Sequence, residues 1–274
     1  MRVSFPGRLS TLFITAAVLL SAAATNTFAQ GGDRMTAVQR EIQRQRQRLT
    51  SSEVEERRDA LMRLARLKRL DASRAAVVGL SDPAPMVRVS AAHAILSLPP
   101  QEAVALLTPL LQDKLEFVRR ETAYALGETR SRSAVEPLAN VLLSDKEAGV
   151  RGAAAVALGK IGDETAVPAL VQTLGGPTPQ PKKKKSKARE NEFVLRAATR
   201  SLGQIRSRAA LNILIATLGN QEYPSDVRRE AAIALGMIGD TAAVPSLRAA
   251  FLSDDPYLSA AAREALRRLR VSVN

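Results

Sequence analysis

Apolar residues recur in this chain at the spacing of one face of an α-helix, in pairs of short stretches separated by turn residues. In one such pair the first stretch has its apolar residues at Val150, Ala154, Ala157, Leu158 and Ile161. The second stretch has them at Val167, Leu170, Val171 and Leu174. Intervals of three and four residues predict two amphipathic helices joined by a tight turn.

The same helix pair is repeated along most of the chain. A Val-Arg pair opens the first helix at 87–88, 118–119, 150–151 and 227–228, and Val194 and Leu258 are looser matches. Successive anchors lie 31, 32, 44, 33 and 31 residues apart, so one repeat carries an insertion. An Ala-Leu-Gly triplet or a near relative follows at 125–127, 157–159, 201–203 and 234–236.

Glycine and proline mark the ends of the predicted helices. Gly162 and Gly239 follow the last apolar residue of a first helix, where glycine favours the left-handed stop. An Ala-Val-Pro triplet opens the second helix, where a first-turn proline is tolerated. Neither helix can bury its apolar stripe alone, so neighbouring pairs must stack. The pattern predicts an all-α, right-handed α-solenoid of antiparallel helix pairs, with about six repeats plus a terminal half repeat.

The repeated motif, VRxxAAxALGxIGDxxAVPxLxxxL, is nearly intact at 150–174 and 227–251. It resembles HEAT repeats, in particular the short HEAT-like repeats of the phycobilisome (PBS) lyase type, over residues 53–270. The resemblance implies a solenoid that most often serves as a protein-binding scaffold. Some HEAT-like proteins are enzymes, either bilin lyases or deoxyhypusine hydroxylases that hold iron with His-Glu pairs. Here His93 is the single histidine and Ala94 follows it, which argues against the hydroxylase activity.

The two ends of the solenoid depart from the motif. Residues 30–52 are rich in Arg and Gln and place Met35, Val38, Ile42 and Leu49 on one helical face. This pattern predicts an N-terminal capping helix, with a coiled coil as the alternative. Ser52 and Glu55 have the spacing of a capping box for the first repeat. At the other end, residues 258–269 predict an arginine-rich terminal helix, followed by a tail at 271–274.

The first 29 residues have the layout of a secretory signal peptide. Arg2 and Arg8 precede an apolar stretch from Leu12 to Ala24, and small residues stand at Thr27 and Ala29. A membrane anchor is the alternative, but this stretch is short for spanning a bilayer. We therefore expect cleavage after Ala29, a periplasmic or secreted protein, and no transmembrane helix in the mature chain. A bilin lyase would not normally meet its substrate there.

Composition narrows the candidate chemistry. The chain has 274 residues, a net charge of +13, no Cys, no Trp and nine aromatic residues in all. Without cysteine there is no thiol nucleophile or thiolate metal site, and one histidine cannot build a multi-histidine metal centre. Few aromatic residues disfavour a platform for stacking nucleic-acid bases. We therefore predict no catalytic residues, no metal and no cofactor.

Charged residues recur at two fixed positions of the repeat. Each of Asp82, Asp113 and Asp145 lies five residues before the valine of a Val-Arg pair, where it can cap the first helix. The following arginines are Arg88, Arg119, Arg151 and Arg228. HEAT-like repeats contain an Asp/Arg ladder between units, so we interpret these residues as structural. A basic binding stripe is the alternative.

The insertion, at about 176–192, is the one feature that the repeat does not explain. It contains Lys182, Lys183, Lys184, Lys185, Lys187 and Arg189. Like charges this close repel each other, so the segment is expected to stay disordered. It is either a solvated loop or a tether to a polyanion, such as an anionic envelope polymer, and binding of that kind would weaken steeply with salt. No aromatic residue interrupts it, so sequence-specific nucleic-acid recognition is not supported.

The second helices of such solenoids normally line the concave side and form the candidate binding surface. The candidate partner-binding residues are Leu106, Leu110, Glu136, Asn140, Val141, Gln172, Thr173, Asn212, Ile213 and Thr217. They are mostly small or apolar and nearly uncharged, which favours a protein or peptide partner. A one-residue error in register would exchange some of them with core positions. For Leu106 and Leu110, burial by a neighbouring repeat is the alternative to exposure.

The sequence leaves three functions open. The preferred hypothesis is a non-catalytic interaction scaffold in the bacterial envelope that binds a protein or peptide on the concave surface of its second helices. The alternative is a polyanion-binding protein acting through the basic loop and basic surface. An enzyme of the bilin lyase or oxidoreductase type is the third.

Overall fold

The repeating pattern folds into a stack of helix pairs. In the computed structural model, which describes residues 35–175 and 190–271, every regular element of those residues is an α-helix or a short 3-10 helix. We call the first helix of each pair an A helix and the second a B helix. The A helices are α3 (Val54–Leu67), α5 (Pro85–Ala94), α7 (Glu116–Glu128), α9 (Ala148–Ile161), α11 (Glu192–Ile205) and α13 (Ser225–Ile238), followed by the unpaired α15 (Pro256–Arg268). The B helices are α4 (Leu70–Ala76), α6 (Pro100–Leu107), α8 (Val135–Ser144), α10 (Val167–Thr173), α12 (Leu211–Gly219) and α14 (Val244–Phe251).

Short 3-10 helices lengthen or introduce the B helices. α4 and α6 continue as η1 (Val77–Ser81) and η2 (Thr108–Gln112). The later B helices are entered through η3 (Arg132–Ala134), η4 (Glu164–Ala166), η5 (Arg208–Ala210) and η6 (Thr241–Ala243). Six helix pairs and one terminal helix therefore occupy residues 54–175 and 190–271, and the predicted all-α solenoid is confirmed.

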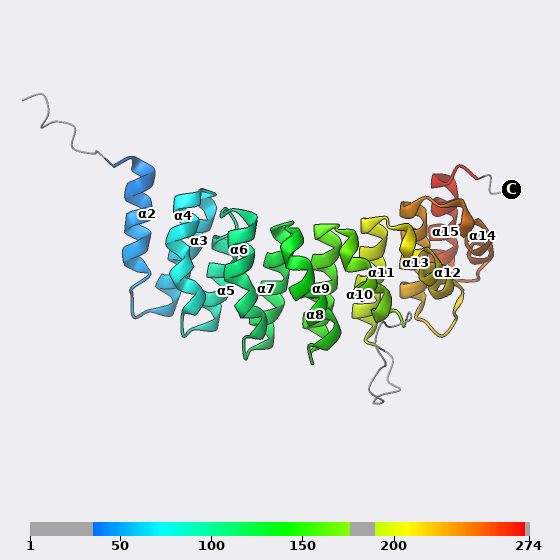
Figure 1. The fold of residues 1–274 in the computed structure, drawn as a ribbon, viewed down its shortest axis with the longest axis horizontal. Helices are drawn as coiled ribbons and strands as arrows, with labels where there is room; N and C mark the ends of the chain where they lie inside the picture. The colour runs from blue at the N-terminus through cyan, green and yellow to red at the C-terminus, as the bar shows by residue number, and fades with distance from the viewer. Residues whose placement is uncertain (1–34, 176–189, 272–274) are drawn as a thin grey trace, which may run out of the picture. The chain divides into compact units, whose positions relative to one another are not determined.

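Each helix pair packs on the next pair in the chain. Successive A helices from α7 to α15 contact one another, and the B helices α8, α12 and α14 contact the A helices that follow them. The ribbon in Figure 1 shows this sequential order, with each repeat placed between its chain neighbours. The core is made of leucines and alanines with no exposed surface, such as Leu126, Leu158, Leu202 and Leu235. The amphipathic spacing read from the sequence produces this core because each stripe is covered by an adjacent repeat.

The glycine of the Ala-Leu-Gly triplet allows neighbouring A helices to approach closely. A methyl group at Gly203 would lie 2.8 Å from the Ala234 Cα atom, and one at Gly127 would lie 2.8 Å from the Ala157 Cα atom. A methyl group at Gly236 would lie 2.9 Å from the Ala265 Cα atom. Such distances are too short for any side chain, so these glycines are required by the packing of one repeat on the next.

A second set of glycines ends the A helices, as the sequence predicts. Gly162 and Gly239 have φ of 75° and 79°, and their backbone N–H groups donate to the carbonyls of Leu158 and Leu235. Residues other than glycine rarely adopt this left-handed conformation. Arg206 nevertheless ends α11 with φ of 59°.

The chain divides into two compact units, Met1–Gln43 and Arg44–Asn274. In the described part of the first unit, α2 (Ala37–Arg48) begins with a reciprocal cap, because Thr36 and Gln39 each accept from the backbone N–H of the other. Within the second unit, Arg48 donates to Asp59 of α3 at 2.6 Å. The helical part of the predicted capping segment is therefore present, and its capping role stays a prediction.

The expected capping box at the start of the first repeat is wrong. Glu55 accepts from the Arg58 guanidinium instead of turning back to the helix start. The hydroxyl that accepts from the Glu53 N–H belongs to Ser51, which lies one residue before the predicted Ser52. The spacing of Ser52 and Glu55 is therefore coincidental.

Three predicted segments fall beyond what the structure describes. The signal peptide at 1–29 lies outside the described residues. The Lys-rich segment from Lys182 to Arg189 lies outside them too, and so does most of the tail. The chain leaves the described part at Gly175, after α10, and re-enters it at Glu190, before α11.

Candidate partner-binding surface on the B helices

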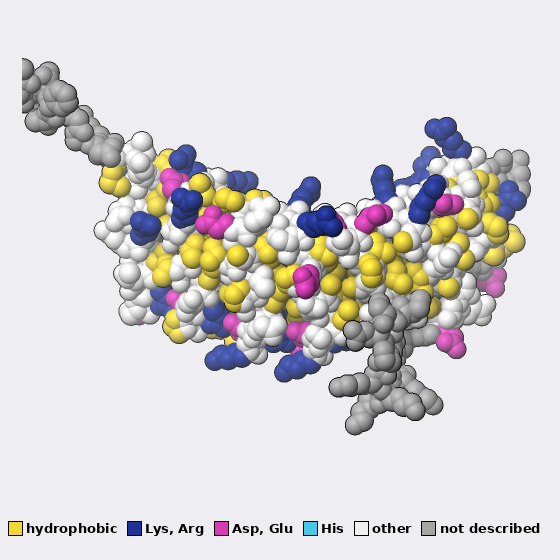
Figure 2. Space-filling model, in the orientation of Figure 1, with side chains coloured by type: hydrophobic (Ala, Val, Ile, Leu, Met, Phe, Trp, Pro, Cys, Tyr) yellow, Lys and Arg dark blue, Asp and Glu magenta, His cyan; other side chains and the backbone are white. Residues whose placement is uncertain are grey.

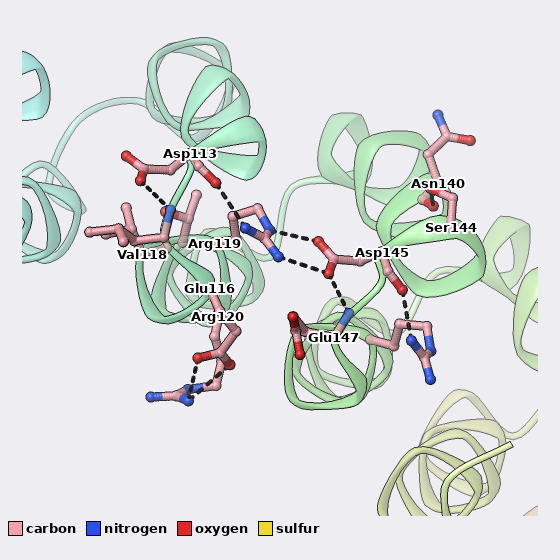
Figure 3. A network of polar contacts seen from close by, with 12 residues as sticks. Asp113, Glu116, Val118, Arg119, Arg120, Asn140, Ser144, Asp145 and Glu147 are labelled. Carbon is pink, nitrogen blue, oxygen red and sulfur yellow. Dashed lines mark hydrogen bonds and ion pairs between the residues drawn. The ribbon is translucent and has the colours of Figure 1, made fainter.

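A ladder of arginine and carboxylate pairs joins successive repeats at the C-terminal ends of the B helices. Figure 3 shows its central step, in which Arg119 Nε donates to Asp145 Oδ2 at 2.7 Å and Nη2 donates to Oδ1 at 3.0 Å. The third nitrogen, Nη1, donates to the Asp113 backbone carbonyl at 2.9 Å. Asp145 also accepts from the Glu147 N–H and so holds the first turn of α9. We call this pairing of two guanidinium nitrogens with two carboxylate oxygens a fork. Both side chains of the pair are only 8% exposed, so the fork forms a rigid, desolvated link between repeats.

The same two-pronged pairing occurs in three other repeats. Arg57 donates to Asp82, Arg88 to Asp113 and Arg151 to Glu190, each through Nε and Nη2. The structure thus brings together the predicted ladder residues Asp82, Arg88, Asp113, Arg119 and Asp145, and places Arg151 in the same role.

Two members of the ladder, Arg57 and Glu190, were missed by the sequence interpretation. Arg57 precedes Asp82 by the same interval as Arg88 precedes Asp113, which could have revealed it. Glu190 belongs to the insertion, and the motif gives no signal for it.

Arg228 is an exception to the predicted ladder. Its Nε donates to the Leu218 backbone carbonyl at 3.0 Å, and no carboxylate of the described residues pairs with it. Its assignment to the ladder is therefore wrong. The Val-Arg pair at 227–228 is intact and gives no sign of this, but Ser253, five residues before the next anchor Leu258, stands where the earlier repeats have Asp and could have revealed it.

The ladder lowers the pKa of its carboxyl groups. At Asp82 the main cause is the hydrogen bond from the Arg57 guanidinium. At Asp145 burial raises the pKa, but hydrogen bonds from Arg119 and from the Glu147 N–H outweigh burial, and the pKa is lowered overall. At Asp113 burial also raises the pKa, and Arg88 and the Leu115 N–H again lower it by more. These groups therefore stay ionised in the folded protein at pH values where the unfolded chain already binds protons.

This shift predicts a one-sided pH dependence of stability. A carboxylate whose pKa is lower in the folded state contributes stability above its unfolded pKa and loses it as the pH falls through its folded pKa. Since the ordinary value for aspartate is 3.8, we expect the melting temperature to be nearly constant between about pH 7 and pH 5 and to fall below about pH 4. Thermal melts followed by circular dichroism would measure this. A loss of stability that begins well above pH 5 would contradict the prediction.

The B helices expose most of the predicted partner-binding residues at least in part, but not all of them. Among the ten predicted residues, Glu136, Asn140 and Asn212 are exposed, while Leu106, Gln172, Thr173 and Ile213 are half-buried. Leu110, Val141 and Thr217 are buried, with Thr217 completely inaccessible. These three cannot contact a partner without unpacking the repeat, so they are removed from the candidate set. Val141 and Thr217 both lie six residues after the first residue of their helices, α8 and α12.

A groove on this surface lies between α6–η2 and α8. It has a volume of about 780 Å³, and the Arg119 guanidinium with Asp113 and Asp145 lies at its base. Its exposed wall residues include Pro109 of η2 and Glu136 and Asn140 of α8.

A second groove, of about 440 Å³, lies between α8 and α10 and shares Glu136 with the first. Gln172 and the apolar Leu143 line this second groove. The B surface is therefore continuous across three repeats.

The surface combines apolar area with uncharged amides. Figure 2 shows hydrophobic side chains over the middle of one face of the repeats and Lys and Arg side chains gathered at its edges. The side-chain amides of Asn140, Gln172 and Asn212 form no hydrogen bond with another described residue, and the Ser144 hydroxyl donates to the backbone carbonyl of Asn140. An amide of this kind can donate and accept at once, as the main chain of a bound peptide requires.

Metal-ligating side chains are not clustered in the part of the chain that the structure describes. Within 35–175 and 190–271 no group of three or more His, Asp or Glu side chains is arranged to hold a metal ion. His93 is exposed, and its Nε2 atom lies 3.8 Å from Glu121 Oε2 on the adjacent repeat. In the same ranges no helix is long and apolar enough to cross a membrane.

Comparison with known proteins agrees with this architecture. The family model described as HEAT repeats matches residues 42–124, 112–185 and 184–267. No curated protein matches the sequence. The fold and its B-helix surface thus define a helical-repeat protein of the scaffold type, and the chain belongs to the HEAT-repeat family.

Solved structures with similar folds are distant in sequence. The Escherichia coli protein YIBA_ECOLI is 19% identical, with a TM-score of 0.56, covering 95% of this chain and 90% of that one. The karyopherin Kap121p, bound to the extreme C-terminus of the phosphatase Cdc14p, is 12% identical with a TM-score of 0.58, and the match covers 92% of this chain and 32% of Kap121p. The CpcE–CpcF complex of phycocyanin lyase from Nostoc sp. PCC7120 is 23% identical with a TM-score of 0.48, covering 88% of this chain and 89% of that one. At these identities the likeness shows the fold alone.

Proposed function

We propose that this protein is a non-catalytic scaffold of the bacterial envelope that binds an extended protein segment along its B helices. The observation that carries the proposal is the groove of about 780 Å³ between α6–η2 and α8, with exposed Pro109 and Asn140 above a rigid base. Proline provides a flat apolar contact, and the amide of Asn140 can pair with a peptide main chain. The signal-peptide layout of residues 1–29 supports export.

Preorganisation of the groove supports binding of a flexible segment. Its base is held by the Arg119 fork, which spans two repeats and donates through all three nitrogens. A surface that does not move on binding loses less conformational entropy, so more of the contact energy appears as affinity. Kap121p, whose fold is similar, is bound to the C-terminus of another protein, and this likeness supports a peptide as the bound segment.

Substitution of one exposed residue tests whether the partner binds in this groove. In Asn140→Arg the larger cation occupies the groove and removes the amide, so we expect affinity for the captured partner to fall at least about tenfold. The partner would be identified by capture from an envelope extract at moderate salt, and its dissociation constant then measured with both purified proteins.

Gln101→Arg is the matched control. Gln101 is exposed on the first turn of α6, whereas the groove lies beyond the C-terminal end of that helix. Gln101 does not line the groove. The same charge change there is expected to leave affinity unchanged. Equal affinity for Asn140→Arg and the native protein would overturn the groove assignment. Binding that depends on residues 182–185 and disappears at moderate salt would instead support the polyanion function.

A further inference from the structure

The guanidinium group of Arg228 has no carboxylate partner among the described residues, in contrast to its equivalents in earlier repeats. Arg57, Arg88, Arg119 and Arg151 each hold a carboxylate of the next repeat through two nitrogens. Arg228 uses Nε on the Leu218 carbonyl, and within the described ranges nothing accepts a hydrogen bond from its two Nη nitrogens. A half-buried guanidinium that is left with free donors is a ready site for an anion with two oxygens.

The connection between α14 and α15 lacks the ladder aspartate, because Ser253 stands two residues before the N-cap of α15, where Asp82, Asp113 and Asp145 stand in earlier repeats. Before α11, Glu190 stands directly ahead of the N-cap Asn191 and reaches Arg151. Before α15, Asp254 stands directly ahead of the N-cap Asp255. Asp254 is exposed and forms no ion pair with Arg228 in the described structure, and its side chain is one methylene shorter than that of Glu190.

The N-cap residue cannot take the place of Asp254. Asp255 uses its carboxylate on the Tyr257 and Leu258 N–H groups and is committed to the helix cap. The two Nη nitrogens of Arg228 therefore have no carboxylate among the described residues, and Arg228 borders the space between α12 and α14.

Arg228 lines a pocket of about 380 Å³ between α12 and α14 and is its one charged lining residue among the described residues. The pocket also contains the hydroxyls of Ser246 and Ser253 and the amide of Gln221, all able to donate to an anion. Its apolar wall includes Leu252, which is 80% exposed. Exposed leucine beside an unpaired guanidinium matches a ligand that carries a carboxylate next to an apolar side chain.

We propose that the Arg228 pocket binds a carboxylate of a partner protein, from either its C-terminus or an acidic side chain, with an apolar group held against Leu252. The proposal rests on the function proposed above and adds a chemical requirement on the bound segment. The pocket occupies the B-helix side of the last two repeats, so a segment that follows the B helices would reach it. In this scheme the partner supplies a carboxylate like those that pair with Arg57, Arg88, Arg119 and Arg151 in four of the earlier repeats.

The main comparison uses two probes that differ only at the carboxyl end, which is a carboxylate in one and an uncharged amide in the other. The full-length protein is titrated with N-acetyl-leucine and with N-acetyl-leucinamide, and the NMR shifts of the Gln221 and Ser253 backbone amides are followed. We expect saturable shifts with the acid and at least about tenfold weaker binding of the amide, because the charge-assisted fork is lost. N-acetyl-glutamic acid α-amide, which carries only the side-chain carboxylate, separates the two sources of the group.

Three variants make the outcome decisive. Asp254→Glu restores the longer side chain that Glu190 uses, so it is expected to close the pair with Arg228 and abolish acid binding without loss of stability. Arg228→Gln should abolish it as well, while Asp254→Asn should retain it. Equal binding of acid and amide, or acid binding that survives in Asp254→Glu, would overturn the proposal. These results are independent of the Asn140→Arg test, because Arg228 does not line the α6–α8 groove.

Discussion

Replacing Asp145 with alanine is expected to lower the free energy of unfolding by about 3–5 kcal/mol, because it leaves a buried arginine without its counter-ion. Arg119 is desolvated and spans the interface between two repeats, so it cannot turn to water without unpacking that interface. The substitution also removes the acceptor for the Glu147 N–H at the start of α9. Urea denaturation followed by circular dichroism would measure the loss as a lower midpoint.

Asp254→Ala is the matched control for this change. It removes the same carboxylate from the connection between a B helix and the next A helix, but Asp254 is exposed and unpaired in the described structure. We expect a change of at most about 0.5 kcal/mol, as for ordinary surface positions. If Asp145→Ala were as mild as its control, the ladder would contribute little to stability and its arginines would need another explanation.

The second large effect is expected from Gly203→Ala, which should destabilise the protein by about 1–3 kcal/mol through overpacking. The added methyl group would meet the backbone of α13 at Ala234, and backbone cannot move aside as a flexible side chain can. Alanine favours helix over glycine by about 1 kcal/mol, so any net loss measures steric conflict alone.

Gly219→Ala provides the comparison. Gly219 is the last residue of α12, and a methyl group there would meet no atom within 4 Å. The substitution should be neutral or stabilising by up to about 1 kcal/mol, since alanine restricts the unfolded chain more than glycine does. Thermal melts of the two variants side by side would separate packing from propensity. If the Gly203→Ala variant were as stable as the Gly219→Ala variant, the repeats would be able to shift apart at no cost, and the prediction would be wrong.

The candidate site was predicted less completely than the fold. Leu110, Val141 and Thr217 were assigned to the surface and are buried, whereas the neighbouring exposed residues Glu136 and Asn140 were assigned correctly. One residue along an α-helix rotates the side chain by about 100°, so a register error of a single position moves it from the surface into the core. The apolar spacing of a B helix cannot correct this error, because small residues such as Ala and Thr occur on both sides.

Local spacing and a motif repeated many times were enough to establish the helix pairs, their period, the stops at Gly162 and Gly239, and the HEAT-repeat family. Three further points depend on how the repeats pack. Contact with the neighbouring repeat sets the rotation of each B helix and therefore the surface that is exposed. Close approach of A helices explains why the Ala-Leu-Gly triplet ends in glycine at Gly203. The residues that precede the next A helix decide whether an arginine has a carboxylate partner, as in Arg151 with Glu190, or none among the described residues, as in Arg228, because an ion pair forms only where its atoms meet.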